Sequence, residues 1–220
     1  MASYVAMFYI LLFSIATIIA TATTPLVIWL YKHFGWDQPA ENKLQKFKNT
    51  HLGNIPRGGG IVVFLAIALT LTLFVPLDTR LIAILISCTI LAIVGFLDDI
   101  YDLNPFLRLG TNILVALIII GAGIGIDFVT NPFADGVIYF DFITIPIEIG
   151  VFHLDLSVVA ATLALVFIVA MINIVNWSKG VDGQMPGVVA LSTIFIGVLS
   201  LRFNDPAQSG ITSLSFIATG

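Results

Sequence analysis

The chain has 220 residues and a formal net charge of −4; 59% of its residues are hydrophobic and 10% are charged. This composition is too apolar for a soluble domain with a single core and indicates a membrane protein. The nine lysines and arginines form no dense basic block, which argues against nucleic acid as a partner, and the single Cys88 excludes a disulfide framework.

Apolar runs recur along the whole chain. A helix needs about 20 apolar residues to cross ~30 Å of hydrocarbon. The runs predict spans near 5–31, 58–76, 80–97, 109–127, 157–175 and 187–201, and a seventh that begins around 209. The expected fold is therefore all-α. It is a polytopic transmembrane helix bundle that forms a single membrane domain over 1–220, with about six complete helices. Because the seventh run stops at Gly220, we expect the sequence to be the N-terminal part of a longer protein.

Basic residues are concentrated in alternate loops. By the positive-inside rule, loops 32–57, 98–108 and 176–186 are expected to be cytoplasmic and the amino terminus to lie outside. Seven basic residues support this orientation: Lys32, Lys43, Lys46, Lys48, Arg57, Arg108 and Lys179. Two residues, Arg80 and Arg202, oppose it.

The first of these loops ends in a glycine-rich stretch, Arg57-Gly58-Gly59-Gly60, that runs directly into an apolar span. Small residues at a helix N-terminus expose backbone N–H groups, which together with Arg57 could bind a phosphate. Close packing of helices through small residues explains the same stretch equally well.

Asp98 and Asp99 directly follow the third run, and Asp102 lies three residues further on. On a continuing helix Asp98 and Asp102 would share a face and repel each other. A divalent cation such as Mg²⁺ would remove that repulsion and would neutralise the charge that develops in phosphoryl transfer. The alternative is that the acids only cap the helix and mark topology, although acids at a helix C-terminus oppose its dipole. Arg108 could pair with them or hold a phosphate.

Residues 128–156 alternate apolar and polar side chains around Asn131-Pro132 and Asp135-Gly136, which predicts a short extracytoplasmic β-hairpin. The last cytoplasmic loop then begins with Asn173 and Asn176. Their three-residue spacing lets both amides point to one side of a helix, where they suit a polar ligand such as a sugar or nucleobase. A flexible turn with two capping asparagines is the alternative.

Taken in order, these stretches resemble the successive motifs of one family. They are Pro56-Arg57-Gly58-Gly59-Gly60, Asp98-Asp99 with Asp102, and Asn173-x-x-Asn176 with Asp182-Gly183. The family is the polyprenyl-phosphate N-acetylhexosamine-1-phosphate transferases, glycosyltransferase family 4. It includes the translocase that makes lipid I and the enzymes that start O-antigen and teichoic-acid linkage synthesis. The stretch from Asp37-x-Pro39 through Asn42-Lys43 to His51 is also similar to the family's first loop.

The resemblance implies a multi-pass enzyme of the cell (inner) membrane with a cytoplasmic active site. A polyprenyl-phosphate oxygen would attack the β-phosphate of a UDP-sugar with Mg²⁺ bound and release UMP. The implied partners are the lipid, the UDP-sugar and the membrane, and a homodimer is an open possibility. The implied catalytic residues are Asp98 and Asp99, and the implied metal ligands are Asp99 and Asp182. The expected substrate-binding residues are Arg57, Gly59, Asp102, Arg108, Asn173, Asn176 and Lys179.

Two departures from the family pattern bear on this reading. Lys179 stands where the family usually has an aspartate, which changes the local charge by two units and opens the alternative of a catalytically inactive relative that binds the lipid carrier or acts as a scaffold. The family's later acidic motif and His-rich loop would lie beyond Gly220. A transporter is disfavoured because the acids and amides gather at one predicted face instead of mid-span.

Overall fold

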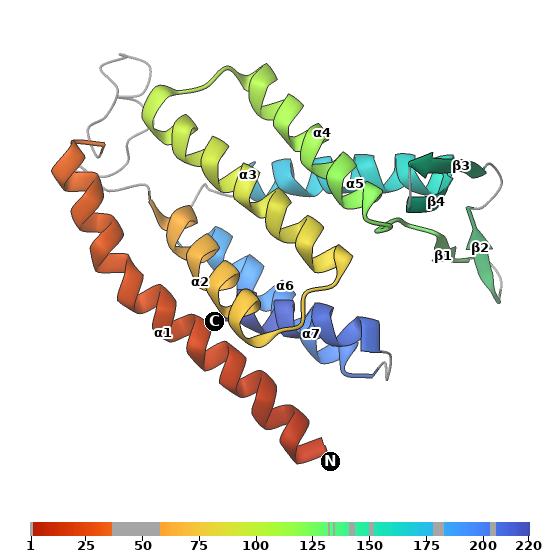
Figure 1. The fold of residues 1–220 in the computed structure, drawn as a ribbon, viewed down its shortest axis with the longest axis horizontal. Coiled ribbons are helices and arrows are strands. Elements are labelled where there is room, and N and C mark those ends of the chain that lie inside the picture. The colour runs from red at the N-terminus through yellow and green to blue at the C-terminus, as the bar shows by residue number, and fades with distance from the viewer. Residues whose placement is uncertain are drawn as a thin grey trace. The chain divides into compact units, whose positions relative to one another are not determined.

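The computed structural model describes residues 2–36, 58–131, 133, 135–140, 144–149, 152–177, 183–202 and 206–220. In these ranges the helices are α1 (Ala2–Phe34), α2 (Gly59–Phe74), α3 (Thr79–Tyr101), α4 (Pro105–Gly121), α5 (Val158–Trp177), α6 (Gln184–Ser200) and α7 (Pro206–Thr219) (Figure 1). The strands are β1 (Phe128–Thr130), β2 (Val137–Tyr139), β3 (Thr144–Ile149) and β4 (Phe152–Ser157). The expected helical membrane fold is confirmed.

The chain divides into two compact units. One comprises Met1–Leu77, Ala92–Asn104 and Pro186–Gly220, and the other comprises Asp78–Leu91 and Pro105–Met185. The first unit thus holds α1, α2, α7, nearly all of α6 and the C-terminal end of α3. The second holds the rest of α3, α4, α5 and the strands. That the whole chain forms a single membrane domain stays a prediction.

In the first unit, α1 runs beside α2 (Figure 1) and also packs against α7. The buried residues of α1 are separated by three or four residues or by sums of such steps, which is the spacing of one helix face. At one end of this stripe the ring of Tyr9 stacks on Phe216 of α7, with centroids 5.3 Å apart. At the other end Val27 and Tyr31 form a buried cluster with Val62 of α2.

Hydroxyl groups join α6 to α7. Thr193 and Thr219 share a hydrogen bond of 2.8 Å, and Ser200 and Thr212 share one of 2.7 Å. Gly197 lets the ring of Phe216 approach, since a Cβ there would lie 3.2 Å from the ring. Small residues and interhelical hydroxyl bonds are typical of helix contacts in lipid.

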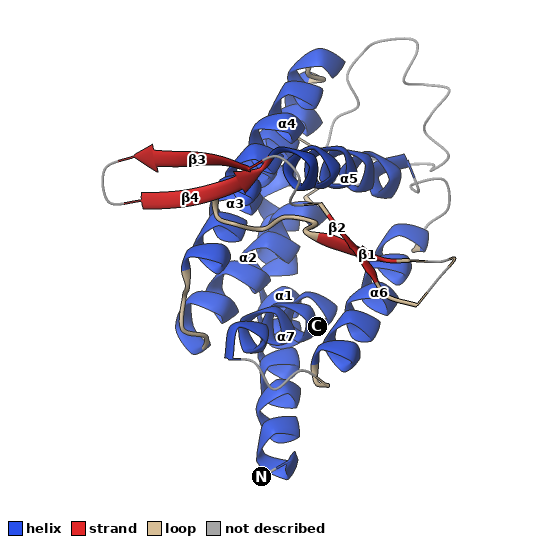
Figure 2. Ribbon diagram, turned by 90° about the vertical axis from the view of Figure 1, so that its right-hand side faces the viewer, coloured by secondary structure: helices blue, strands red, loops and turns tan. Residues whose placement is uncertain are grey.

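In the second unit α4 packs against α5, and the strands form two antiparallel hairpins, β1–β2 and β3–β4 (Figure 2). The sequence predicted one hairpin over 128–156. The first hairpin has the expected turn, in which Asn131 N–H donates to the Gly136 carbonyl. The second was missed because only two residues, 150 and 151, separate its strands, and a single glycine is a weak turn signal.

Three described helices are long and apolar enough to cross a membrane: Ala6–Phe34, Thr79–Tyr101 and Val158–Trp177. Helices α2, α4 and α6 have 16 or 17 residues, at the lower limit of about 17 for a span. The predicted run 109–127 extends past the end of α4. Gly123 adopts a left-handed φ of 79°, and the N–H of Ile124 bonds to the Ile119 carbonyl, which closes the helix.

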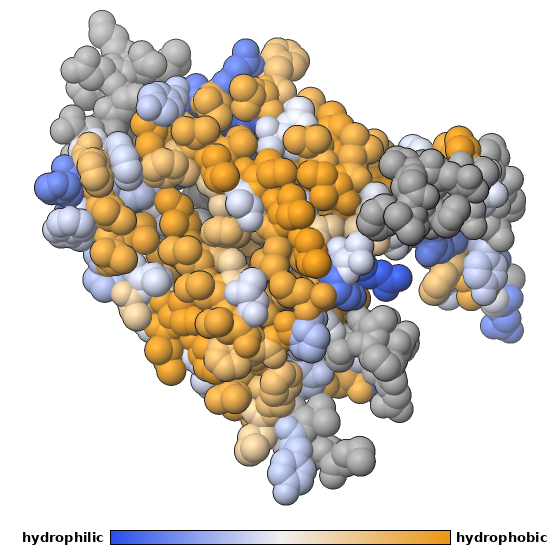
Figure 3. Space-filling view, viewed as in Figure 1, coloured by the Kyte–Doolittle hydropathy of each residue, from blue (hydrophilic) through white to orange (hydrophobic). Residues whose placement is uncertain are grey.

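Large apolar side chains lie on the surface of many helices, as the visible face in Figure 3 shows. Leu73, Phe106 and Val166 are each more than 60% exposed. A soluble domain would bury many of these groups, whereas a membrane protein turns them to hydrocarbon.

Candidate functional site

The acidic motif lies at the C-terminal end of α3. The helix continues through Asp98 and Asp99 to Tyr101, beyond the predicted span end at residue 97. Asp102 is the first residue after the helix, with a φ of 50°, and its N–H donates to the Asp98 carbonyl at 3.0 Å. Because Asp102 has left-handed backbone, it does not continue the helical face of Asp98. The expectation that Asp98 and Asp102 share one face of a helix is therefore wrong.

Asp98 stabilises this helix end. Its carboxylate accepts a 3.0 Å hydrogen bond from the N–H of Leu103. The capping role that the sequence allowed for the acids is therefore confirmed for Asp98. Its hydrogen bond to the Leu103 N–H fixes the chain just after Asp102. Asp98 and Asp99 are half-buried and Asp102 is exposed. The three acids thus differ in their surroundings although the sequence treats them alike.

A residue from another part of the sequence, Tyr31 of α1, packs against this end of α3. The Tyr31 side chain is 1% exposed, and its hydroxyl has no hydrogen-bond partner among the described residues. Its ring lies 6.1 Å from that of Phe96, which precedes Asp99 by one helical turn on α3. The ring of Trp36 packs edge-on against both, at 5.8 Å from Tyr31 and 5.0 Å from Phe96.

The glycine motif also contacts Tyr31. Gly58 is buried and is the N-cap of α2. A Cβ on Gly58 would lie 2.6 Å from Val27 Cγ1 and 2.7 Å from Tyr31 Cε2, so only glycine fits against these two side chains. Gly59 is the first residue of α2 and is exposed. Arg57 lies outside the described residues.

Sequence reasoning missed Tyr31. It falls within an apolar run, where an aromatic ring is expected to serve only for packing. The available signal was its place on the buried stripe of α1 together with a polar hydroxyl. Buried tyrosines usually find a partner for that group.

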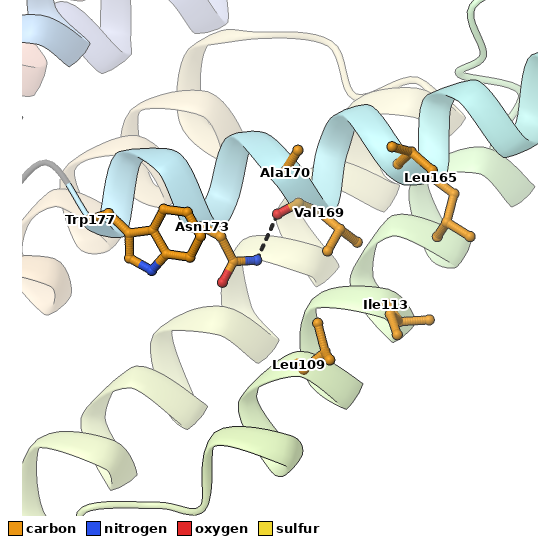
Figure 4. Close-up of a pocket in the computed structure, with 8 residues that line it drawn as sticks. Leu109, Ile113, Leu165, Val169, Ala170, Asn173 and Trp177 are labelled. Carbon is orange, nitrogen blue, oxygen red and sulfur yellow. Dashed lines mark hydrogen bonds between the residues drawn. The ribbon is translucent and has the colours of Figure 1, made fainter.

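The asparagines lie on the last two turns of α5, in the second unit. Asn173 is half-buried and its amide donates to the Val169 carbonyl at 2.7 Å, so part of its hydrogen-bonding capacity serves its own helix (Figure 4). Asn176 is exposed. Asn173 and Trp177 border an open apolar pocket of about 500 Å³ between α4 and α5, completed by Leu109, Ile113, Leu165, Val166, Val169 and Ala170.

The remaining predicted site residues are placed only in part. Arg108 is half-buried on the first turn of α4. Lys179 and Asp182 lie outside the described residues, so the metal pair predicted from Asp99 and Asp182 is not described. Within the ranges that the structure covers, no three His, Cys, Asp or Glu side chains cluster closely enough to hold a metal ion. The acids belong to the first unit, whereas Arg108 and the asparagines belong to the second.

Comparisons with known proteins agree with the motifs. A relative from Bacillus subtilis strain 168, a probable undecaprenyl-phosphate N-acetylglucosaminyl 1-phosphate transferase, is 29% identical over 167 residues, covering 74% of this chain and 40% of its own. A phospho-N-acetylmuramoyl-pentapeptide-transferase from Clostridium perfringens strain SM101 is 28% identical over 205 residues, covering 84% of this chain and 56% of its own. The chain thus spans about half the length of these relatives. No solved structure matches it. The model of glycosyl transferase family 4 matches residues 81–220, which is more than half of the chain, and the chain therefore belongs to that family.

Proposed function

We propose that the full-length protein transfers a sugar-1-phosphate from a UDP-sugar to a polyprenyl phosphate in the synthesis of cell-envelope polysaccharide or peptidoglycan precursors. Membership of the family and the names of the two relatives support this activity. The observation that carries it is local. Two half-buried acids, Asp98 and Asp99, lie near the end of α3, and Phe96 of the same helix packs against Tyr31, the tyrosine that contacts the glycine motif.

In the proposed reaction an oxygen of the lipid phosphate forms a bond to the β-phosphorus of the UDP-sugar. The bond from that phosphorus to the bridging oxygen breaks, and UMP leaves with the electron pair. Asp98 fixes the turn after α3 through its bond to Leu103. We therefore assign Asp99 the more direct part, which is to face the reacting phosphates.

The carboxylates suit Mg²⁺, which prefers oxygen ligands and commonly binds one or two carboxylates together with substrate phosphates. Asp99 and Asp182 would hold the ion, and the bound ion would neutralise charge on the transferring phosphoryl group. Asp98 remains a proposed catalytic residue beside Asp99.

The other proposed contacts are to substrate. Asn173 and Asn176 offer amides at the end of α5, and Arg108 offers a guanidinium at the start of α4, which suits a phosphate. The full proposed set is Arg57, Gly59, Asp102, Arg108, Asn173, Asn176 and Lys179.

We further propose that the protein lies in the cell (inner) membrane with this site at the cytoplasmic face and its amino terminus outside. The distribution of lysine and arginine among the loops supports that orientation. The homodimer stays a prediction.

The test uses the full-length protein in detergent with undecaprenyl phosphate and a panel of UDP-sugars, and it follows UMP release with Mg²⁺ or with EDTA. We expect release only with both lipid and metal, and we expect Asp99→Asn to abolish it. Asp135→Asn, the same change at an exposed acid between β1 and β2, is the matched control and should keep full activity. The proposal fails if a folded preparation releases no UMP with any sugar. The inactive, lipid-binding relative suggested by Lys179 would then be the better account.

A further inference from the structure

The Tyr31 side chain contacts the glycine motif and also packs against α3, the helix that carries the acidic motif. Its ring is the surface against which the backbone of Gly58 packs, and a Cβ on that glycine would lie 3.1 Å from Tyr31 Cζ, the ring atom that bears the hydroxyl. The same ring packs edge-on against Phe96, three residues before Asp99 on α3. Residues three apart lie on one side of a helix, so Asp99 follows Phe96 toward the side that faces Tyr31.

The hydroxyl of Tyr31 is unusual in this setting. It is buried and has no hydrogen-bond partner among the described residues. Leaving such a donor unsatisfied generally destabilises a protein, and phenylalanine would fill the same space without that cost. Packing alone therefore accounts for the ring of Tyr31 but not for its oxygen. Polar groups that reduce stability are characteristic of functional sites.

The Asp99 carboxylate is the candidate hydrogen-bond acceptor for the Tyr31 hydroxyl. Asp99 lies one helical turn after Phe96, on the side of α3 that packs against Tyr31, and a phenol O–H is a good donor to a carboxylate. The aromatic cluster of Tyr31, Trp36 and Phe96 holds the end of α1 against this end of α3.

We propose that Tyr31 is a positioning residue for the transfer reaction, whose hydroxyl donates a hydrogen bond to the Asp99 carboxylate and fixes it toward the metal and phosphates of the bound substrates. This inference rests on the proposed function. It also explains why Gly58 has no side chain, because a Cβ there would push the Tyr31 ring away from its position. Partners that orient a metal-binding carboxylate typically change activity or metal affinity by about 10- to 100-fold when they are removed.

The test compares Tyr31→Phe with Tyr9→Phe in the full-length protein. Tyr9 is also a buried tyrosine of α1, but it stacks on Phe216 at the other end of the buried stripe, so its change is chemically identical and remote from the acids. For each variant we would measure kcat and KM for the UDP-sugar, the Mg²⁺ concentration for half-maximal activity, and the melting temperature with and without Mg²⁺ and UMP.

We expect Tyr31→Phe to lower kcat by at least about 10-fold with little change in KM for the UDP-sugar, and to raise the Mg²⁺ requirement. Its melting temperature without ligands should equal or exceed that of the wild type, while the increase caused by Mg²⁺ and UMP should shrink. Tyr9→Phe should leave kcat and the Mg²⁺ response unchanged.

The two proposals fail in different ways. If the wild type transfers sugar phosphate and Tyr31→Phe matches it in kcat and Mg²⁺ response, the positioning role is overturned and the proposed function stands. If the wild type releases no UMP, the proposed function fails, and the melting temperatures decide the inference. A response to Mg²⁺ that is lost in Tyr31→Phe alone supports the contact with Asp99, and an equal response, or none in any variant, overturns it.

Discussion

Replacing Gly58 by alanine tests the meeting of α1 and α2 with a single methyl group. The added Cβ would lie 2.6 Å from Val27 Cγ1 and 2.7 Å from Tyr31 Cε2. Carbon atoms in good contact are about 3.5–4.0 Å apart, so the overlap is roughly 1 Å with each side chain. Both side chains are buried, Val27 at 5% and Tyr31 at 1% exposure, so any movement that relieves the overlap must displace their packed neighbours.

Overpacking of this kind typically destabilises a protein by about 1–3 kcal/mol. In a domain of 150–250 residues each kcal/mol corresponds to a fall in melting temperature of roughly 2–4 °C. Thermal unfolding of the purified protein in detergent, followed by the fluorescence of Trp36 and the other tryptophans, measures this fall. Activity should decrease as well, because the Tyr31 ring must move.

Gly60→Ala is the matched control. Gly60 lies two residues further along, in the first turn of α2, and a Cβ there meets nothing within 4 Å. The control should match or slightly exceed the wild type, because alanine favours helix over glycine by about 1 kcal/mol. The reasoning is refuted if Gly58→Ala melts at or above the temperature of Gly60→Ala.

Two further predictions concern the end of α3. Asp102→Gly should melt at a higher temperature than Asp102→Ala, because both changes remove the carboxylate and only glycine adopts the φ of 50° without strain; equal melting temperatures would contradict the backbone argument, and a loss of UMP release in a folded Asp102→Gly variant would support a substrate role for Asp102. Asp98→Ala should lower stability by about 1 kcal/mol through loss of the bond to the Leu103 N–H, while Asp98→Asn, which keeps an acceptor oxygen, should melt close to the wild type; equal melting temperatures for the two would rule out the capping role.

The helical membrane fold was predictable because long apolar runs have few alternatives, but helix ends were not. Hydropathy cannot distinguish Gly121-Ala122-Gly123 from helix, although the left-handed Gly123 ends α4 there. It also ended the third span at residue 97, whereas α3 carries both Asp98 and Asp99 on its last turns. Hydropathy averaged over about 20 residues does not detect backbone geometry that depends on one or two of them.

The candidate site, too, was predictable only in part from the sequence. The charged motifs were visible because charge is rare in this chain. Tyr31 was not, because the reason for its importance is a long-range contact between α1 and α3. The different surroundings of Asp98 and Asp102 depend on the turn after α3, which the spacing of the acids does not reveal. Arg57, Lys179 and Asp182 lie outside the described residues, and their roles stay predictions.

The paired hydroxyls of α6 and α7 define how these two helices are aligned. Thr193 and Ser200 are seven residues apart on α6, and their partners Thr219 and Thr212 are seven apart on the antiparallel α7. A slide of one helix past the other by a single turn, about 5.4 Å, would therefore break both hydrogen bonds together. Intermediate alignments would place none of these four hydroxyls opposite its partner, and wherever the contact lies in hydrocarbon no water replaces the lost hydrogen bonds. The two bonds thus select one alignment over its neighbours, a form of specificity that apolar packing between smooth helices would supply poorly.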